Sequence, residues 1–368
     1  MKPNVDLFKP LYPINQLHPS FQWIMSAPGH QPTRDVMQRV FDTFHDVDGN
    51  FVEQLQTTGF DARIWELYLF AVWTNHGFTH DRTHERPDYL LERAGVAFGV
   101  EAVTSNPPQG SQPQVRGEGL KSIADVLEYQ RNIMPIRLGS SLFSKLKKKM
   151  KQKKGEMEMK YWELPQMKDK PLVFAIEAFH DADSLGFSDS ALITYLYGLN
   201  HHPTWDERGN LVVQQTQVTR HKHKEKDIPS GFFNQPDAEN ASAVIFSNSG
   251  TIAKFQRMGY ASGVYPQIAT MRRAGCCYDW TPNAHAPAWF HYEVGDPDYP
   301  ETWGQGLTIH HNPRAKIPLD MDVFDGFYQG WINKDCQYVS EVPDFHPFAS
   351  KTVCLVPRPD DEVRTSVK

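Results

Sequence analysis

Residues 86–104 read RPDYLLERAGVAFGVEAVT, and this stretch decides the predicted fold. It contains two strand-like segments, Asp88–Glu92 and Val96–Thr104, separated by a short glycine-containing turn. Such a hairpin runs antiparallel, so we expect it to bring Asp88 and Glu101 together.

The residues before this hairpin predict a helix and a third strand. Gly59–Asn75 repeats apolar residues at helical spacing, which indicates an amphipathic helix. We expect Asp61 to cap its start and Gly77 to end it. A short strand, Phe78–Asp81, then leads into the hairpin.

The residues after the hairpin alternate helix and strand. Lys121–Asn132 has a helical pattern, and a further helix begins at Ser140 and enters a lysine cluster. Pro171–Phe179 is a continuous apolar run, typical of a strand buried on both faces, and Ser190–Leu199 reads as a helix. This alternation predicts a layered α/β fold with a mixed sheet flanked by helices.

Composition shifts divide the chain into three expected parts. They are an irregular N-terminal arm over residues 1–58 with one helix at Thr33–Phe44, a core over 59–218 with a lysine-rich insertion at 145–160, and an accessory C-terminal region over 231–368. The last part is loop-rich and α+β in character, with a strand predicted at Ser242–Ser247 and a helix at Thr251–Met258.

Bulk composition excludes several classes. The chain has 368 residues, 40% hydrophobic and 22% charged, which is ordinary globular usage. Its net charge of -6 means that any nucleic-acid surface must be a local patch. No apolar run approaches the roughly 20 residues of a membrane helix. The N-terminus lacks the apolar run of a signal peptide, and the four cysteines form no disulfide framework, so we expect a cytoplasmic protein without membrane partners.

Three acidic residues are the candidates for chemistry. Asp88 starts one hairpin strand, Glu101 lies inside the other, and Glu66 lies in the preceding helix. Clustered carboxylates repel one another and need a cation, and oxygen ligands select a hard ion such as Mg²⁺ or Mn²⁺. Such an ion polarises a phosphodiester and activates water. The alternative is that all three are ordinary surface groups.

The order helix-Glu, Pro-Asp, then Glu in the next strand resembles the PD-(D/E)xK, or restriction-endonuclease-like, nucleases over residues 60–198. The resemblance implies that Asp88 and Glu101 hold the metal and that Glu66 supports it. It also implies a restriction-endonuclease-like core and hydrolysis of nucleic acid, with DNA as the expected substrate. The blocks Trp65–Tyr68 and Val100–Pro108 also resemble a group of bacterial proteins, a likeness that adds no mechanism.

One position departs from the family pattern. The family places a lysine two residues after the second acid, and here that position is Val103. Some members supply the lysine from a neighbouring helix, which makes Lys145 the first candidate and Lys121 the second. If neither reaches the acids, the chain is a non-catalytic nucleic-acid- or protein-binding module that retains the nuclease fold.

The lysine cluster is a second candidate feature. Residues 145–154 hold seven lysines. Phosphate binding is one use of such a run, and a solvated surface is the other. Its place beside the acids favours nucleic acid. The expected phosphate contacts are Arg137, Lys147, Lys148, Lys149 and Lys151.

Histidines also occur in groups, at His201–His202, His221–His223 and His310–His311. No carboxylate lies at ligand spacing from them, and lysines flank one group, so we expect surface histidines rather than a metal site.

Overall fold

A mixed sheet of eight strands organises the chain, in the order β1-β2-β3-β4-β9-β12-β13-β14. The computed structural model describes residues 5–105, 120, 122–150, 158–179, 183–263, 265 and 268–356. The strands of this sheet are β1 (Thr79–Asp81), β2 (Tyr89–Arg93), β3 (Val96–Ser105), β4 (Leu172–Ala178), β9 (Ala243–Ser247), β12 (Leu307–His311), β13 (Tyr328–Ile332) and β14 (Tyr338–Glu341). Strands β1, β2 and β3 form an antiparallel meander, and β4 runs parallel to both β3 and β9.

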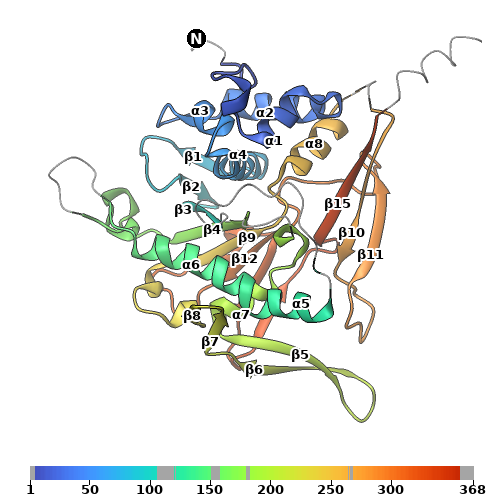
Figure 1. Cartoon of the computed structure of the whole chain (residues 1–368). Helices are drawn as coiled ribbons and strands as arrows, with labels where there is room; N and C mark the ends of the chain where they lie inside the picture. Colours follow the sequence, from blue (N-terminus) through green and yellow to red (C-terminus); the bar gives the residue numbers. More distant parts are fainter. Residues whose placement is uncertain are drawn as a thin grey trace, which may run out of the picture.

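Helices cover both faces of the sheet, with a separate apolar core under each set (Figure 1). One face carries α1 (Pro19–Ser26), α2 (Gln31–Thr43), α3 (Phe51–Gln56), α4 (Phe60–Asn75) and α8 (Ile252–Ala261). The other carries α5 (Ile123–Glu128), α6 (Met134–Lys147) and α7 (Ser190–Tyr197). The prediction of a mixed α/β fold with helices flanking a mixed sheet is confirmed.

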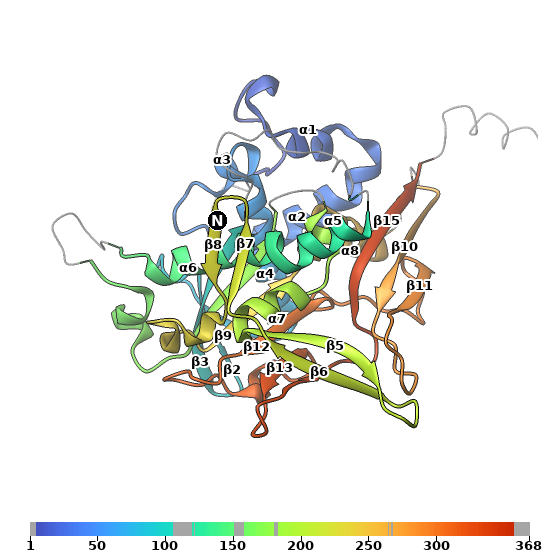
Figure 2. The same cartoon turned by 60° about the horizontal axis from the view of Figure 1, so that its bottom comes forward.

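Three smaller sheets lie around this body. A three-stranded sheet combines β10 (Thr270–Cys277), β11 (Ala288–Glu293) and β15 (Pro347–Leu355). Two hairpins pair β5 (Leu199–Trp205) with β6 (Leu211–Gln217), and β7 (Arg220–His223) with β8 (Lys226–Pro229). Figure 2 shows the β5–β6 hairpin projecting from the body, while β7–β8 stays beside α6.

The predicted amphipathic helix exists as α4, but two details of that prediction are wrong. Asp61 does not cap it, because the helix begins at Phe60 and Gly59 stands at the cap position without a side-chain bond. The helix is also buried beyond one stripe, since Trp65, Leu69 and Trp73 are buried as well as the predicted apolar face. The cause is tertiary: Trp65 packs on the sheet and donates its indole N–H to the Ala175 carbonyl of β4, and Trp73 packs against Phe78 and Phe324, while α2 and α3 cover another part of α4. Gly77 does follow its end, with a positive φ of 75°.

Both ends of the chain are more ordered than the sequence predicts. The described part of the N-terminal arm contains three α-helices, α1 to α3, where one helix was predicted. The C-terminal region supplies β9, β12, β13 and β14 to the same sheet as β1 to β4. The change in composition near residues 218–231 therefore marks the hairpins rather than the edge of the sheet. Within the described residues, no helix is both long and apolar enough to cross a bilayer.

Candidate functional site

The β2–β3 hairpin places Asp88 and Glu101 side by side. Tyr89 pairs with Val100 in the antiparallel register, so the preceding residue, Asp88, lies opposite Glu101 on the same face. The Asp88 carboxylate is tied to the neighbouring strand, since Oδ2 accepts a hydrogen bond of 2.7 Å from the backbone N–H of Ala102.

Glu101 is a buried carboxylate in which one oxygen accepts hydrogen bonds and the other has no hydrogen-bond partner among the described residues. Its residue is 3% exposed. Oε1 accepts hydrogen bonds from Lys145 Nζ and from the hydroxyl of Tyr161, each at 2.5 Å. Oε2 is buried and has no hydrogen-bond partner among the described residues. A buried anionic oxygen without a partner costs free energy, which a cation at that position would recover.

The fold supplies a lysine beside Glu101 from a different element than the family pattern. Val103, two residues after Glu101, is 2% exposed and packs in the apolar core below α6. The connection between the parallel strands β3 and β4 carries α6 across this face, so that Lys145 in its last turn reaches Glu101. Lys121 lies outside the described residues.

Glu66 approaches from α4 and is already paired. Its Oε2 accepts a 2.5 Å hydrogen bond from Arg63 of the preceding helical turn, and its side chain is 15% exposed. The hydroxyl of Tyr89, from the same hairpin as Asp88, donates to the Glu66 backbone carbonyl at 2.5 Å. Glu66 is therefore near the two hairpin acids but has its own counter-charge.

The acids perturb one another electrostatically. Burial raises the pKa of Asp88 well above its usual range, and the charges of Glu101 and Glu66 raise it further. Burial also raises the pKa of Glu66, which Arg63 partly offsets. Burial lowers the pKa of Lys145, but the attraction of Glu101 and Asp88 outweighs it and the pKa is raised overall. Lys145 is thus a charged ammonium beside these carboxylates.

No three His, Cys, Asp or Glu side chains within the described ranges form a ready-made metal-ligand group. The arrangement offers two carboxylates instead, and one oxygen of Glu101 is buried without a hydrogen-bond partner among the described residues. Mg²⁺ keeps several waters and takes only one or two carboxylates together with substrate phosphates, so two acids are a sufficient protein contribution.

The expected phosphate contacts on and after α6 separate into different roles. Lys147 is committed to Asp237, with Nζ at 2.7 Å from Oδ2, so its assignment as a free phosphate ligand is weakened. Lys148 and Lys149 are exposed and form no ion pair with the described residues. Arg137 is half-buried on α6, and Lys151 lies outside the described residues.

A groove of about 580 Å³ adjoins Lys145. The C-terminal end of β3, α6 and the β7–β8 hairpin form its walls. Arg137, Lys148 and Lys226 line it together with Lys145, and serine and threonine residues make up most of the remaining lining.

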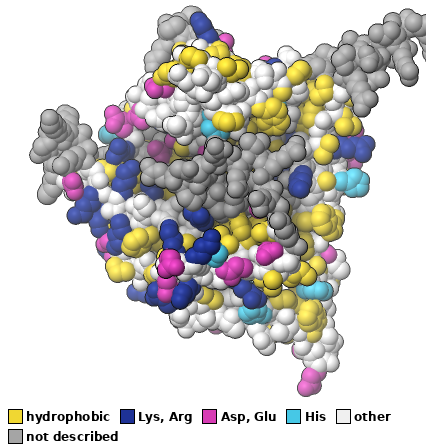
Figure 3. Space-filling model, viewed as in Figure 1, with side chains coloured by type: hydrophobic (Ala, Val, Ile, Leu, Met, Phe, Trp, Pro, Cys, Tyr) yellow, Lys and Arg dark blue, Asp and Glu magenta, His cyan; other side chains and the backbone are white. Residues whose placement is uncertain are grey.

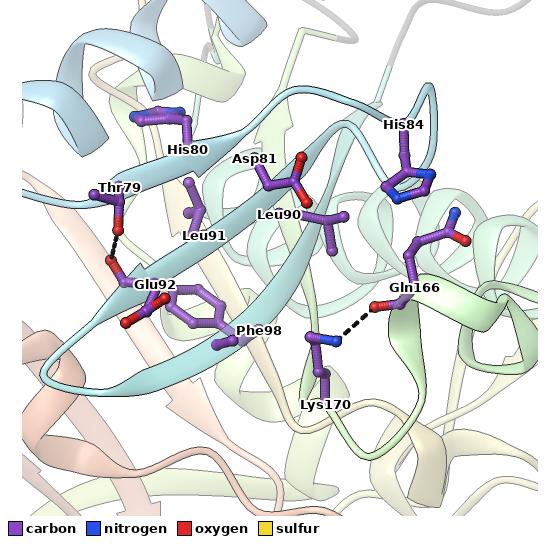
Figure 4. A pocket seen from close by; sticks show the side chains of 11 residues that line it. Thr79, His80, Asp81, His84, Leu90, Leu91, Glu92, Phe98, Gln166 and Lys170 are labelled. Carbon is purple, nitrogen blue, oxygen red and sulfur yellow. Dashed lines mark hydrogen bonds between the residues drawn. The ribbon is translucent and has the colours of Figure 1, made fainter.

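A second hollow, of about 460 Å³, lies at the β1–β2 edge of the sheet. Figure 4 shows Thr79 and Glu92 on one side of it and His84, Gln166 and Lys170 on the other, with the Lys170 ammonium donating to the Gln166 carbonyl. Its lining mixes both signs of charge and contains none of the three candidate acids.

The expectation of surface histidines is wrong for three of them. His221, His310 and His311 are buried, at 1%, 0% and 8% exposure. Each is held by polar partners inside the fold: His221 Nδ1, for example, lies 2.8 Å from the Arg131 carbonyl. His221 lies on β7, and His310 and His311 lie on β12.

Sequence reasoning missed Tyr161 and Lys226. Tyr161 follows the lysine-rich insertion, and nothing in its local pattern distinguishes it from a core tyrosine.

Comparisons with protein-family models, curated proteins and solved structures found no match for this chain.

Proposed function

We propose that this chain is a metal-dependent nuclease with a restriction-endonuclease-like core that hydrolyses phosphodiester bonds of nucleic acid, DNA in the first place. The observation that carries the proposal is the meeting of Asp88, Glu101 and Lys145, which come from three separate elements. The element order supports it: helix α4, the antiparallel strands β1, β2 and β3, helix α6 on the opposite face, and β4 parallel to β3.

The donor set fits a hard divalent ion. Asp88 and Glu101 would hold Mg²⁺ or Mn²⁺, and the buried, unpartnered Oε2 of Glu101 is the atom that most needs a cation. Glu66 would contact the ion through a water molecule, because Arg63 already binds its carboxylate. The ion, when bound, would polarise the phosphodiester and activate water.

Lys145 and Tyr161 complete the site as donors. The raised pKa of Lys145 keeps it protonated at neutral pH, which suits an electrostatic role toward the attacked phosphate and not that of a general base. Tyr161 orients the Glu101 carboxylate through its hydroxyl. Burial raises the pKa of Tyr161 as well, so it stays a neutral donor.

The test is cleavage by purified protein of single- and double-stranded DNA and RNA with Mg²⁺ or Mn²⁺. Glu101→Gln and Asp88→Asn should each lose cleavage by about 10²-fold or more, as expected when a preorganised charge is removed from a reacting centre. Glu92→Gln is the matched control, because Glu92 is an exposed carboxylate on the same hairpin. It should cleave like wild type.

Two results would contradict this proposal. If wild type cleaves nothing under these conditions but binds nucleic acid, the chain is the binding module expected without a functional lysine. If wild type cleaves and Glu101→Gln cleaves equally well, the acids belong to another role.

A further inference from the structure

The groove beside Lys145 is lined by several cations, of which Lys145 itself is paired with Glu101. Arg137, Lys148 and Lys226 line it in addition to Lys145, and the described residues of its lining include no carboxylate and no aromatic ring. The hollow of Figure 4 differs, since Asp81 and Glu92 line it with Lys170. A groove of one charge sign with hydroxyls between the cations suits a chain of phosphates.

Lys226 reaches this groove because the β7–β8 hairpin is fixed against α5, α6 and the helical residues 129–133 between them. His221 Nδ1 lies 2.8 Å from the Arg131 carbonyl, and His223 Nδ1 lies 3.0 Å from Glu128 Oε1. Ile228 on β8 packs closely against Gly139 of α6, since a Cβ added at position 139 would lie 3.0 Å from Ile228 Cδ1. Lys226 is therefore carried on an anchored element and not on a free loop.

The surface view agrees with this placement. Figure 3 shows Lys and Arg side chains gathered over α6 and the β7–β8 hairpin, with some acidic side chains among them. The net charge of the chain is -6, so this concentration is local.

We propose that the groove binds the sugar–phosphate backbone of the strand that adjoins the scissile phosphate, and that Lys226 is a phosphate contact supplied by the β7–β8 hairpin. The inference rests on the proposed function. It adds a wall of the substrate site, formed by residues that follow the nuclease-like elements in the chain. Because the described lining has no aromatic ring for stacking on bases, the contact is independent of base sequence.

The experiment measures binding of wild type and Lys226→Gln to two duplexes of unrelated sequence, in EDTA so that no cleavage occurs, across a series of salt concentrations. Loss of one phosphate contact should reduce the slope of log affinity against log salt by about 0.9, equally for both sequences. Ser141→Ala with Ser144→Ala should weaken binding of both duplexes while leaving that slope unchanged, since these hydroxyls carry no charge.

Lys222→Gln is the matched control. Lys222 is an exposed lysine of the same hairpin that does not line the groove. It should keep the wild-type slope. Equal slopes for Lys226→Gln and Lys222→Gln would overturn the inference, as would a loss confined to one sequence. The proposed function fails differently: either wild type would not cleave with Mn²⁺, or Glu101→Gln would cleave as well as wild type, whatever the slopes.

Discussion

Replacing Lys145 by methionine tests the centre of the site through stability as well as activity. Methionine keeps a long apolar stem on α6 and removes only the ammonium. Glu101 Oε1 would then retain the Tyr161 hydroxyl alone, while Oε2 stays without a partner among the described residues. A carboxylate that is 3% exposed would lose its nearest counter-charge.

The size of the effect follows from burial. Breaking a buried pair by removing one partner costs about 3–5 kcal/mol. Lys145 is 26% exposed on its side chain, so solvent already screens part of the attraction. We therefore expect a loss of about 2–3 kcal/mol in the free energy of unfolding at neutral pH.

Divalent metal should reverse this loss. An ion bound by Asp88 and Glu101 replaces the missing positive charge, and a ligand at one hundred times its Kd stabilises a protein by about 2.7 kcal/mol. Wild type should gain less, because there the ion competes with the ammonium of Lys145 for the same carboxylate. Urea unfolding with and without saturating Mn²⁺ measures both gains. Cleavage by Lys145→Met should fall by about 10²-fold or more.

The control is Lys148→Met, which removes an exposed lysine just after the same helix. Its stability should stay within about 0.5 kcal/mol of wild type. A Lys145→Met loss no larger than that of the control would refute the electrostatic account of the site. So would a loss that Mn²⁺ leaves unchanged while wild type is shown to bind the ion.

Three further predictions follow. The raised pKa of Asp88 means that this carboxyl keeps its proton to higher pH than an ordinary carboxylic acid. Because the ion binds the ionised form, Mn²⁺ affinity should rise with pH through that pKa, and binding should release a proton. Calorimetry in two buffers measures the released proton, and Asp88→Asn should abolish the release. Lys147 is paired with Asp237 and Lys148 has no ion pair in the described structure, so Lys148→Gln should flatten the salt dependence of nucleic-acid binding more than Lys147→Gln, and the reverse order in a filter-binding titration would contradict this. Gly139→Ala would place a Cβ 2.5 Å from the ring of a buried tyrosine on α7, so unfolding should show a loss of about 1–3 kcal/mol, and an unchanged stability would mean that α6 can shift freely.

Local patterns were enough to predict the elements that carry the site. Alternation and a glycine turn define the β2–β3 hairpin, and extending its register by one residue beyond Tyr89 sets Asp88 opposite Glu101. The apolar run that became β4 reads as a strand covered on both faces, which it is. These features depend on side-chain periods of two residues in strands or 3.6 residues in helices, and such periods can be recognised from the sequence of a single segment.

Contacts between distant segments were decided by the tertiary structure. The sequence marks Lys145 only as a candidate, and its meeting with Glu101 depends on the crossover of α6 between two parallel strands. Tyr161 and Lys226 join the site and its groove from segments with no distinguishing pattern, and Lys147 is paired with Asp237, ninety residues along the chain. Ion pairs and groove walls arise where elements pack, and packing partners leave no periodic trace in either segment. For the same reason the sequence predicted one layered core and a loop-rich appendage, whereas pairing of β9 with β4 joins both halves into a single sheet.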